Sequence, residues 1–210
     1  ACRPMPLLKL AVLLAAVASA AALVAQALRA QGYGPRRRFA PPAGKAGDGV
    51  RYAFTGALSP RAKESAREHP LAWAAGMVFH GGVFTGLLTL ALALVGPQLP
   101  SLVAVPLGLV CGLGGLCGMG LLAKRLLQPE LRALSRLDDW ISNLLATTLP
   151  LLALGWLASP RLEAAFFSGA LALLVYAPFG KLRHAVFFFL SRRHLGAFFG
   201  RRGTFPVRHA

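Results

Sequence analysis

Two histidines stand out in an otherwise apolar chain, because their ring nitrogens could ligate a metal. His80 lies in the run "GMVFHGGVF", and His184 ends the run "YAPFGKLRH". An ionisable side chain within an apolar run is costly to place in a membrane and usually has a function. Neutral imidazole is a standard axial ligand of haem iron. We therefore expect His80 and His184, on two different helices, to hold one haem b from the two sides of its plane.

Small residues surround the first of these histidines. Gly76, Gly81 and Gly82 flank His80. Glycine has no side chain, so these positions leave room where a flat macrocycle must approach. A packing histidine, hydrogen-bonded within the membrane, is the alternative interpretation of His80 and stays open.

Basic residues precede the second histidine. Lys181 and Arg183 stand within three residues of His184, where they could neutralise the haem propionates. A histidine beside Lys and Arg at the end of a membrane span can also be an ordinary charged flank. The same ambiguity applies to His69 and His194, which could hold a second haem but are also typical of a solvated surface.

Two further motifs have simpler interpretations. The stretch "CGLGGLCGMG" (111–120) lies inside an apolar run without a following Lys or Ser, so a phosphate-binding loop is excluded. Gly114 and Gly118 form a small-xxx-small pair that permits close helix contact. The three thiols, Cys2, Cys111 and Cys117, are scattered and predict no disulfide framework.

The stretch "LDDWISN" (137–143) places two carboxylates at the start of an apolar run. Asp138 or Asp139 is expected to cap the helix that begins there. A role in proton relay or at a quinone site is the alternative.

The composition indicates that these residues sit in a membrane protein. The 210-residue chain is 56% hydrophobic and only 14% charged, whereas soluble domains carry about 25% charged residues. A membrane-spanning helix needs about 20 mostly apolar residues. Five runs qualify, and we predict an all-α bundle of five transmembrane helices at about 7–28, 70–95, 102–122, 140–157 and 164–190. The first is expected to be a retained span, and Pro178 is expected to kink the fifth.

The basic residues predict the orientation of this bundle. The segments 29–69, 124–139 and 181–210 hold 20 of the 23 Lys and Arg residues. Positive charge marks the cytoplasmic side, so the N-terminus is expected outside and the C-terminus in the cytoplasm. The predicted organisation is a first span (1–29), a cytoplasmic loop (30–69), a four-helix haem-binding membrane region (70–190) and a basic cytoplasmic tail (191–210).

Within the loop, the Pro/Gly-rich stretch 32–49 is expected to be irregular, and "SPRAKESAREHP" (59–70) is expected to form a short polar helix.

Three stretches together resemble one family of membrane proteins. They are "FTGALSPRAKESAREHPLAWAAGMVFHGGVF", "AKRLLQPELRALSRLDDWISNLL" and "YAPFGKLRHAVFFF". In order and spacing they are similar to the gamma subunit of respiratory nitrate reductase and its relatives, the haem b membrane subunits of DsrM-type and heterodisulfide-reductase-like complexes. The resemblance covers roughly residues 50–195.

The resemblance implies a function for the chain. Members of that family have five spans and pass electrons between membrane quinone and an iron–sulfur subunit on the cytoplasmic face of the bacterial inner membrane. Their cytoplasm-side haem is held by one histidine in the second span and one at the end of the fifth, which match His80 and His184. The second haem of nitrate reductase gamma subunits would need ligands near Leu90 and Phe166, which cannot ligate. The resemblance therefore implies one haem, with any quinone site near it. It also implies that the chain is an electron-transfer subunit of a quinol-linked oxidoreductase.

Three other functions compete with this one. A haem-free membrane anchor of a redox enzyme would need no histidine ligands. A small transporter would need paired charges or broken helices along a substrate path, which the runs lack. The net charge of +16 alone would suggest an anionic-lipid or nucleic-acid binder, but the basic residues lie between apolar runs, so we expect membrane lipid and no nucleic acid as a partner.

Overall fold

A computed structural model describes residues 5–34, 40–96 and 99–207 of the chain, and the part it describes is helical without any strand. The predicted all-α class is thus confirmed. Cys2 lies outside the described residues.

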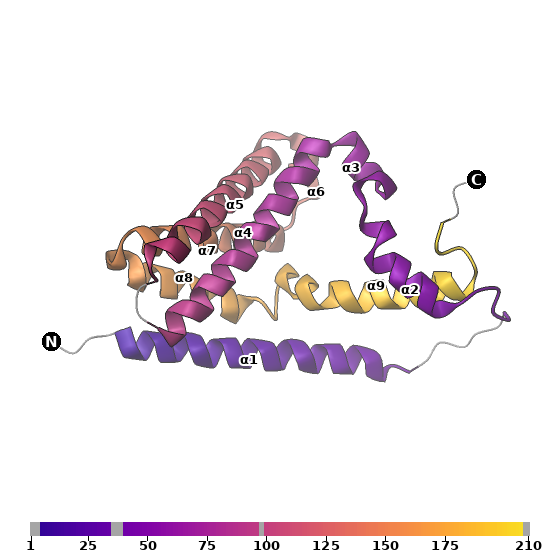
Figure 1. The fold of residues 1–210 in the computed structure, drawn as a ribbon, viewed down its shortest axis with the longest axis horizontal. Coiled ribbons are helices and arrows are strands. Elements are labelled where there is room, and N and C mark those ends of the chain that lie inside the picture. Colours follow the sequence, from indigo (N-terminus) through magenta and orange to yellow (C-terminus); the bar gives the residue numbers. More distant parts are fainter. Residues whose placement is uncertain (1–4, 35–39, 97–98, 208–210) are drawn as a thin grey trace. The chain divides into compact units, whose positions relative to one another are not determined.

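Four helices are each long and apolar enough to cross a membrane (Figure 1). They are α1 (Met5–Gly32), α4 (Pro70–Val95), α5 (Ser101–Leu127) and α7 (Leu137–Ala158). The helices α8 (Glu163–Tyr176) and α9 (His184–Arg201) meet the same test only as a pair, together with the single turns that precede each of them. Four spans, or five when this pair counts as one, indicate a multi-pass membrane protein.

The apolar side chains of these helices are exposed as lipid-facing residues would be. Leu14 of α1, Phe84 of α4 and Leu102 of α5 are 60%, 63% and 87% exposed. A soluble protein rarely leaves so many large apolar side chains uncovered. Helix α4 carries no charged residue at all.

Two of the predicted spans differ from the helices observed. The third was predicted to stop at Lys124 and Arg125, but α5 continues to Leu127. Cations are favourable in the last turn of a helix, because its carbonyl end is negative. The fifth is not one kinked helix around Pro178 but two helices, because α8 ends at Tyr176 and α9 begins only at His184.

Short elements join the long helices. Where one polar helix was predicted before the second span, the structure has two short helices. The stretch 32–49 was predicted to be irregular, but a helix begins inside it at Ala46. These elements are α2 (Ala46–Phe54), η1 (Gly56–Leu58), η2 (Pro60–Ala62), α3 (Glu64–Glu68), α6 (Pro129–Leu134), η3 (Pro160–Leu162) and η4 (Lys181–Arg183).

The chain forms two compact units. The first consists of residues 1–21 and 71–182, and its core contains the fully buried Val12, Leu149, Phe166 and Phe167. The second consists of residues 22–70 and 183–210.

Glycines bring helices of the first unit into close contact. A Cβ atom on Gly82 of α4 would meet the backbone of Gly114 in α5, and one on Gly118 would meet Phe79 and Thr147. The predicted small-xxx-small contact is thus confirmed. Cys111 is buried and Cys117 half-buried in the same helix, and neither forms a disulfide.

Glycines also pack α2 against α9 in the second unit. A Cβ on Gly49 would collide with the backbone of Gly196 and Gly200. The backbone N–H groups of Ala43 and Gly44 donate to the carbonyl of Arg201 at 2.9 and 3.0 Å. The cytoplasmic loop and the tail of the prediction are therefore packed together.

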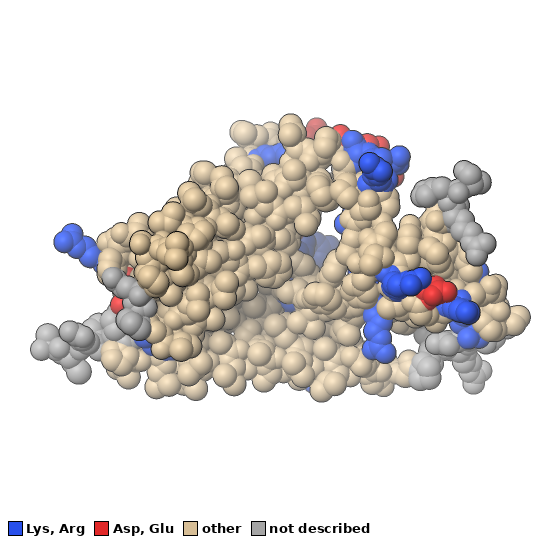
Figure 2. All heavy atoms as spheres, in the orientation of Figure 1, with Lys and Arg blue, Asp and Glu red and all other residues tan. Residues whose placement is uncertain are grey.

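Lys and Arg side chains gather over α3, over α2 and over the end of α9, whereas the visible surfaces of α4 and α5 show almost none (Figure 2). The described part of the second unit holds eleven Lys and Arg residues against three Asp and Glu residues.

Candidate functional site

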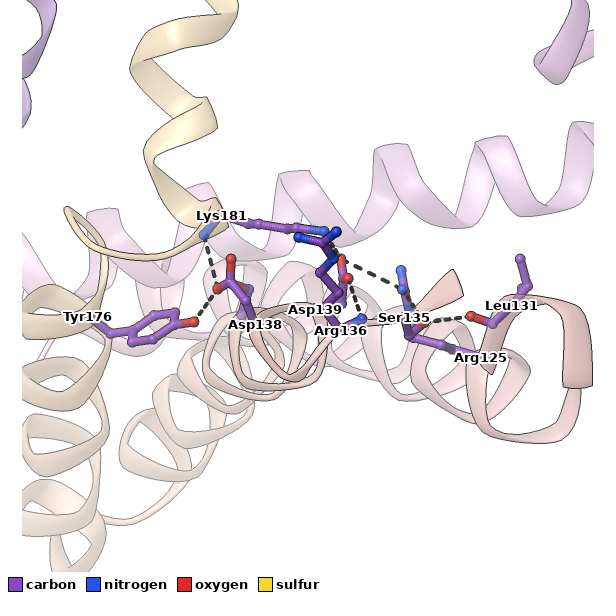
Figure 3. A network of polar contacts seen from close by, with 9 residues as sticks. Arg125, Leu131, Ser135, Arg136, Asp138, Asp139, Tyr176 and Lys181 are labelled. Atoms are coloured by element: carbon purple, nitrogen blue, oxygen red, sulfur yellow. Dashed lines mark hydrogen bonds and ion pairs between the residues drawn. The ribbon is translucent and has the colours of Figure 1, made fainter. Parts of the chain in front are cut away.

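A network of polar side chains joins the start of α7 to the end of α8 in the first unit (Figure 3). Asp138 and Asp139 lie in the first turn of α7, where the positive end of the helix favours carboxylates. Tyr176 is the last residue of α8, and Lys181 begins η4.

Asp138 accepts hydrogen bonds from three separate places. The Tyr176 hydroxyl and the Ser142 hydroxyl donate to its Oδ1, the latter at 3.1 Å, and so does the backbone N–H of Lys181 at 3.2 Å. One carboxylate oxygen therefore fixes the turn that follows α8.

Asp139 is the centre of the ionic part of the network. Its Oδ1 forms an ion pair with Lys181 Nζ and lies 3.8 Å from an η-nitrogen of Arg125, and its side chain is 13% exposed. Its Oδ2 accepts a hydrogen bond from the backbone N–H of Arg136 at 2.9 Å. The expected capping role is thus confirmed for Asp139, the third residue of the helix, which accepts from the backbone N–H of Arg136, the residue before its first turn.

Arg125 extends the network to α5 and to the residue that follows α6. Its guanidinium donates to the Ser135 hydroxyl at 2.8 Å, and that hydroxyl donates to the carbonyl of Leu131 at 2.6 Å. The cluster thus contains two carboxylates, Asp138 and Asp139, and two cationic side chains, Lys181 and Arg125. Its evident effect is to hold the segment that immediately precedes His184.

His80 lies on an exposed face of α4. Its Nδ1 is 2.7 Å from the carbonyl oxygen of Gly76, one turn earlier, and its ring packs edge-on to Phe79 with centroids 5.8 Å apart. A carbonyl can only accept, so Nδ1 carries the proton, and in the neutral imidazole Nε2 then carries the lone pair. This is the tautomer that a ligand through Nε2 requires.

The glycines around His80 divide between two roles. A Cβ on Gly76 or Gly81 would meet no atom within 4 Å, so both positions face open space. Gly82 instead contacts Gly114 of α5. The predicted role of Gly76 and Gly81 beside a haem stays a prediction.

His184 is the first residue of α9, in the second unit, and is exposed. Arg183 directly precedes it, also exposed, and no carboxylate of the described residues lies within 4.0 Å of its guanidinium. His80 and His184 belong to different units, and their joint ligation of one haem stays a prediction.

His69 and His194 lie on the surface. His69 stands exposed between α3 and α4, and His194 is exposed in α9. Within the described ranges, no group of three or more His, Cys, Asp or Glu side chains is placed to hold a metal ion.

The positions where nitrate reductase gamma subunits would carry a second pair of ligands are filled by core residues. Leu90 and Phe166 are 4% and 0% exposed. Trp156 stacks on Phe166 with ring centroids 5.6 Å apart.

Comparison of the chain with protein-family models, with curated proteins and with solved structures gave no match.

Sequence reasoning missed several polar partners. Nothing in the sequence around Tyr176 or Arg125 points to a partner 38 or 14 residues away. Lys9 forms an ion pair with Glu163 in the first turn of α8, with Nζ 2.7 Å from Oε1. A search for acidic residues at the ends of other predicted spans could have suggested both contacts.

Proposed function

We propose that the chain is a haem b subunit of a membrane redox complex. The observation that carries the proposal is the hydrogen bond of His80 Nδ1 to the Gly76 carbonyl, 2.7 Å long, on a helix that has no charged residue. Ligand histidines usually donate their second ring N–H to a carbonyl or carboxylate, which fixes the ring and raises its basicity. The intrahelical bond of His80 supplies this support.

The neighbouring glycines favour a large planar ligand over a small one. Gly76 and Gly81 lie on either side of His80 in the sequence, and both face open space. A packing histidine would gain from side chains around it, whereas a macrocycle needs their absence. Haem iron supplies one-electron chemistry when it is bound.

His184 is the proposed second ligand. Arg183 is the better placed cation for a propionate, because Lys181 Nζ already pairs with Asp139. Asp138 and Asp139 hold the turn before His184 and would position it without touching the haem.

One haem per chain fits the packing of the first unit. Leu90, Phe166 and Trp156 are buried and leave no ligand where the resembled family has its second haem. The proposed haem lies on the cytoplasmic side, with the N-terminus outside and the C-terminus in the cytoplasm of a bacterial inner membrane.

The proposed electron path runs between membrane quinone and an iron–sulfur subunit. The basic second unit, which contains the loop and the tail, is the surface on which that subunit would dock. In this proposal, substrate chemistry would belong to another chain of the complex.

The test is a reduced-minus-oxidised absorption spectrum of the detergent-purified full chain, with haem quantified per polypeptide. About one b-type haem is expected. His80→Ala and His184→Ala should each lose the haem or change its axial ligation, while His69→Ala, a surface histidine, should keep it. Full haem content and an unchanged spectrum in His80→Ala would refute the assignment.

Two other results would change the proposal. Two haems per chain would bring His69 and His194 back as ligands. A colourless, folded protein produced with haem available would leave the chain as a haem-free anchor.

A further inference from the structure

A hollow of about 1110 Å³ runs along one face of α9 within the second unit. Its α9 wall includes Phe187, Phe188 and Phe198, and the end of α1 forms part of the opposite wall. His184, the proposed haem ligand, lines one end of this hollow, which continues along most of α9 beyond it.

The lining residues change in character along the helix. Phe187 and Phe188 lie near its start, Ser191, Arg193 and His194 line its middle, and Arg201 and Arg202 lie at its end. Residues 187, 188, 191, 194, 198 and 201 are spaced by one, three or four, so they share one helix face. At 1.5 Å per residue the face is about 22 Å long, against about 15 Å for the hydrocarbon of one bilayer leaflet.

The arginines of the hollow lack an acidic partner. Among the described residues, no carboxylate lies within 4.0 Å of Arg193, Arg201 or Arg202. Arg202 instead stacks on Phe198, with Cζ 4.7 Å from the ring centroid. The end of α9 is held in place by the two hydrogen bonds that the Arg201 carbonyl accepts from Ala43 and Gly44. The arginines are therefore positioned before any anion arrives.

We propose that this hollow binds one anionic phospholipid. An acyl chain would lie against the three phenylalanines, and the phosphate would be held by Arg201 and Arg202. A wall that carries three phenylalanines together with arginines that have no carboxylate within 4.0 Å matches a ligand with a long apolar part and one anionic end. The long apolar helices of the same chain place it in the bilayer, where such lipids are the surrounding solvent. The proposal does not depend on the haem.

The experiment uses the full chain, delipidated and reconstituted in vesicles of equal parts phosphatidylglycerol and phosphatidylcholine whose acyl chains differ in mass. Gentle extraction and native mass spectrometry then count the lipid that stays bound. The unaltered chain is expected to retain one phosphatidylglycerol, with at least about a tenfold preference over phosphatidylcholine, because each surface arginine strengthens binding to anionic lipid several-fold.

Three variants distinguish binding in the hollow from binding to the overall positive charge of the unit. Arg201→Gln with Arg202→Gln should abolish the preference. Arg61→Gln with Arg67→Gln removes the same charge from exposed positions outside the hollow and should keep it. Ala197→Trp, which fills the hollow without changing charge, should lower retention of the lipid. Circular dichroism checks that each variant keeps its helix content, and haem content should stay unchanged in all three.

The proposal is overturned if both lipids are retained equally by the unaltered chain. It is also overturned if the two arginine pairs have equal effects, since binding would then reflect the overall charge of the unit. Preference for an acidic protein without any preference for phosphatidylglycerol would assign the hollow to a protein partner instead.

Discussion

The hydroxyl of Tyr176 donates a hydrogen bond to Oδ1 of Asp138, and this contact joins the last turn of α8 to the first turn of α7. The two residues are 38 positions apart in the sequence. The bond fixes the end of α8, six residues before the first unit ends at Leu182.

Tyr176→Phe should therefore loosen this junction. The variant keeps the ring and removes only the donor, so we expect the thermal unfolding midpoint of the detergent-solubilised protein to fall by about a few degrees. Tyr33→Phe is the control, because Tyr33 is 83% exposed. Equal midpoints for the two variants would show that the contact does not stabilise the fold.

Gly49→Ala should disrupt the second unit. The added Cβ would collide with the backbone of α9 at Gly196 and Gly200. A helix backbone cannot move aside as a flexible side chain can. Hydrogen exchange followed by mass spectrometry should show faster exchange over α2.

The control for this variant lies two residues away in the same helix. Gly47→Ala meets no atom within 4 Å and should stabilise the helix by about 0.5–1 kcal/mol, because alanine loses less backbone entropy than glycine. Slower exchange in Gly49→Ala than in Gly47→Ala would contradict the described packing.

Gly81→Leu should lower haem content without unfolding the protein. The position faces open space, so a leucine fits the polypeptide alone but would occupy the space proposed for the macrocycle. Haem per polypeptide is measured from the pyridine haemochrome spectrum. Gly120→Leu, equally open in α5, should retain the haem. An equal loss of haem in both variants would show that Gly81 does not leave space for the macrocycle in particular.

Lys9 and Glu163 should be energetically coupled. Their side chains are 34% and 28% exposed and their charged atoms are 2.7 Å apart. In a double-mutant cycle with Lys9→Met and Glu163→Gln, we expect a coupling free energy of about 0.5–1 kcal/mol. Additive effects of the two substitutions on stability would show that the ion pair contributes nothing.

The long helices were predictable because their cause is local. A run such as 70–95 has no charged residue, and its predicted bounds coincide with α4. The end of α5 was not predictable in the same way. Lys124 and Arg125 interrupt the apolar run, yet the helix continues through them because Arg125 finds partners in Ser135 and Asp139.

The contacts that build the candidate site depend on distant residues. His80 could be singled out because a histidine in an apolar run is rare, and its bond to Gly76 lies within one turn. The roles of Tyr176 and Lys181 depend on how α7 and α8 pack, and hydropathy carries no information about that packing. The pairing of α2 with α9 was invisible because glycines, which have no side chain to signal a contact, form its centre.

The glycine-packed pair of α2 and α9 also sets an order of events during synthesis. Ala53 and Arg192, which meet in this pair, are 139 residues apart. A ribosome adding about 5–20 residues per second needs about 7–30 s to cover that distance. During this interval three long apolar helices leave the ribosome while α2 has no partner. The second unit is therefore the last part of the protein to assemble. A transcript that ends before α9 yields a chain in which α2 has no helix to pack against.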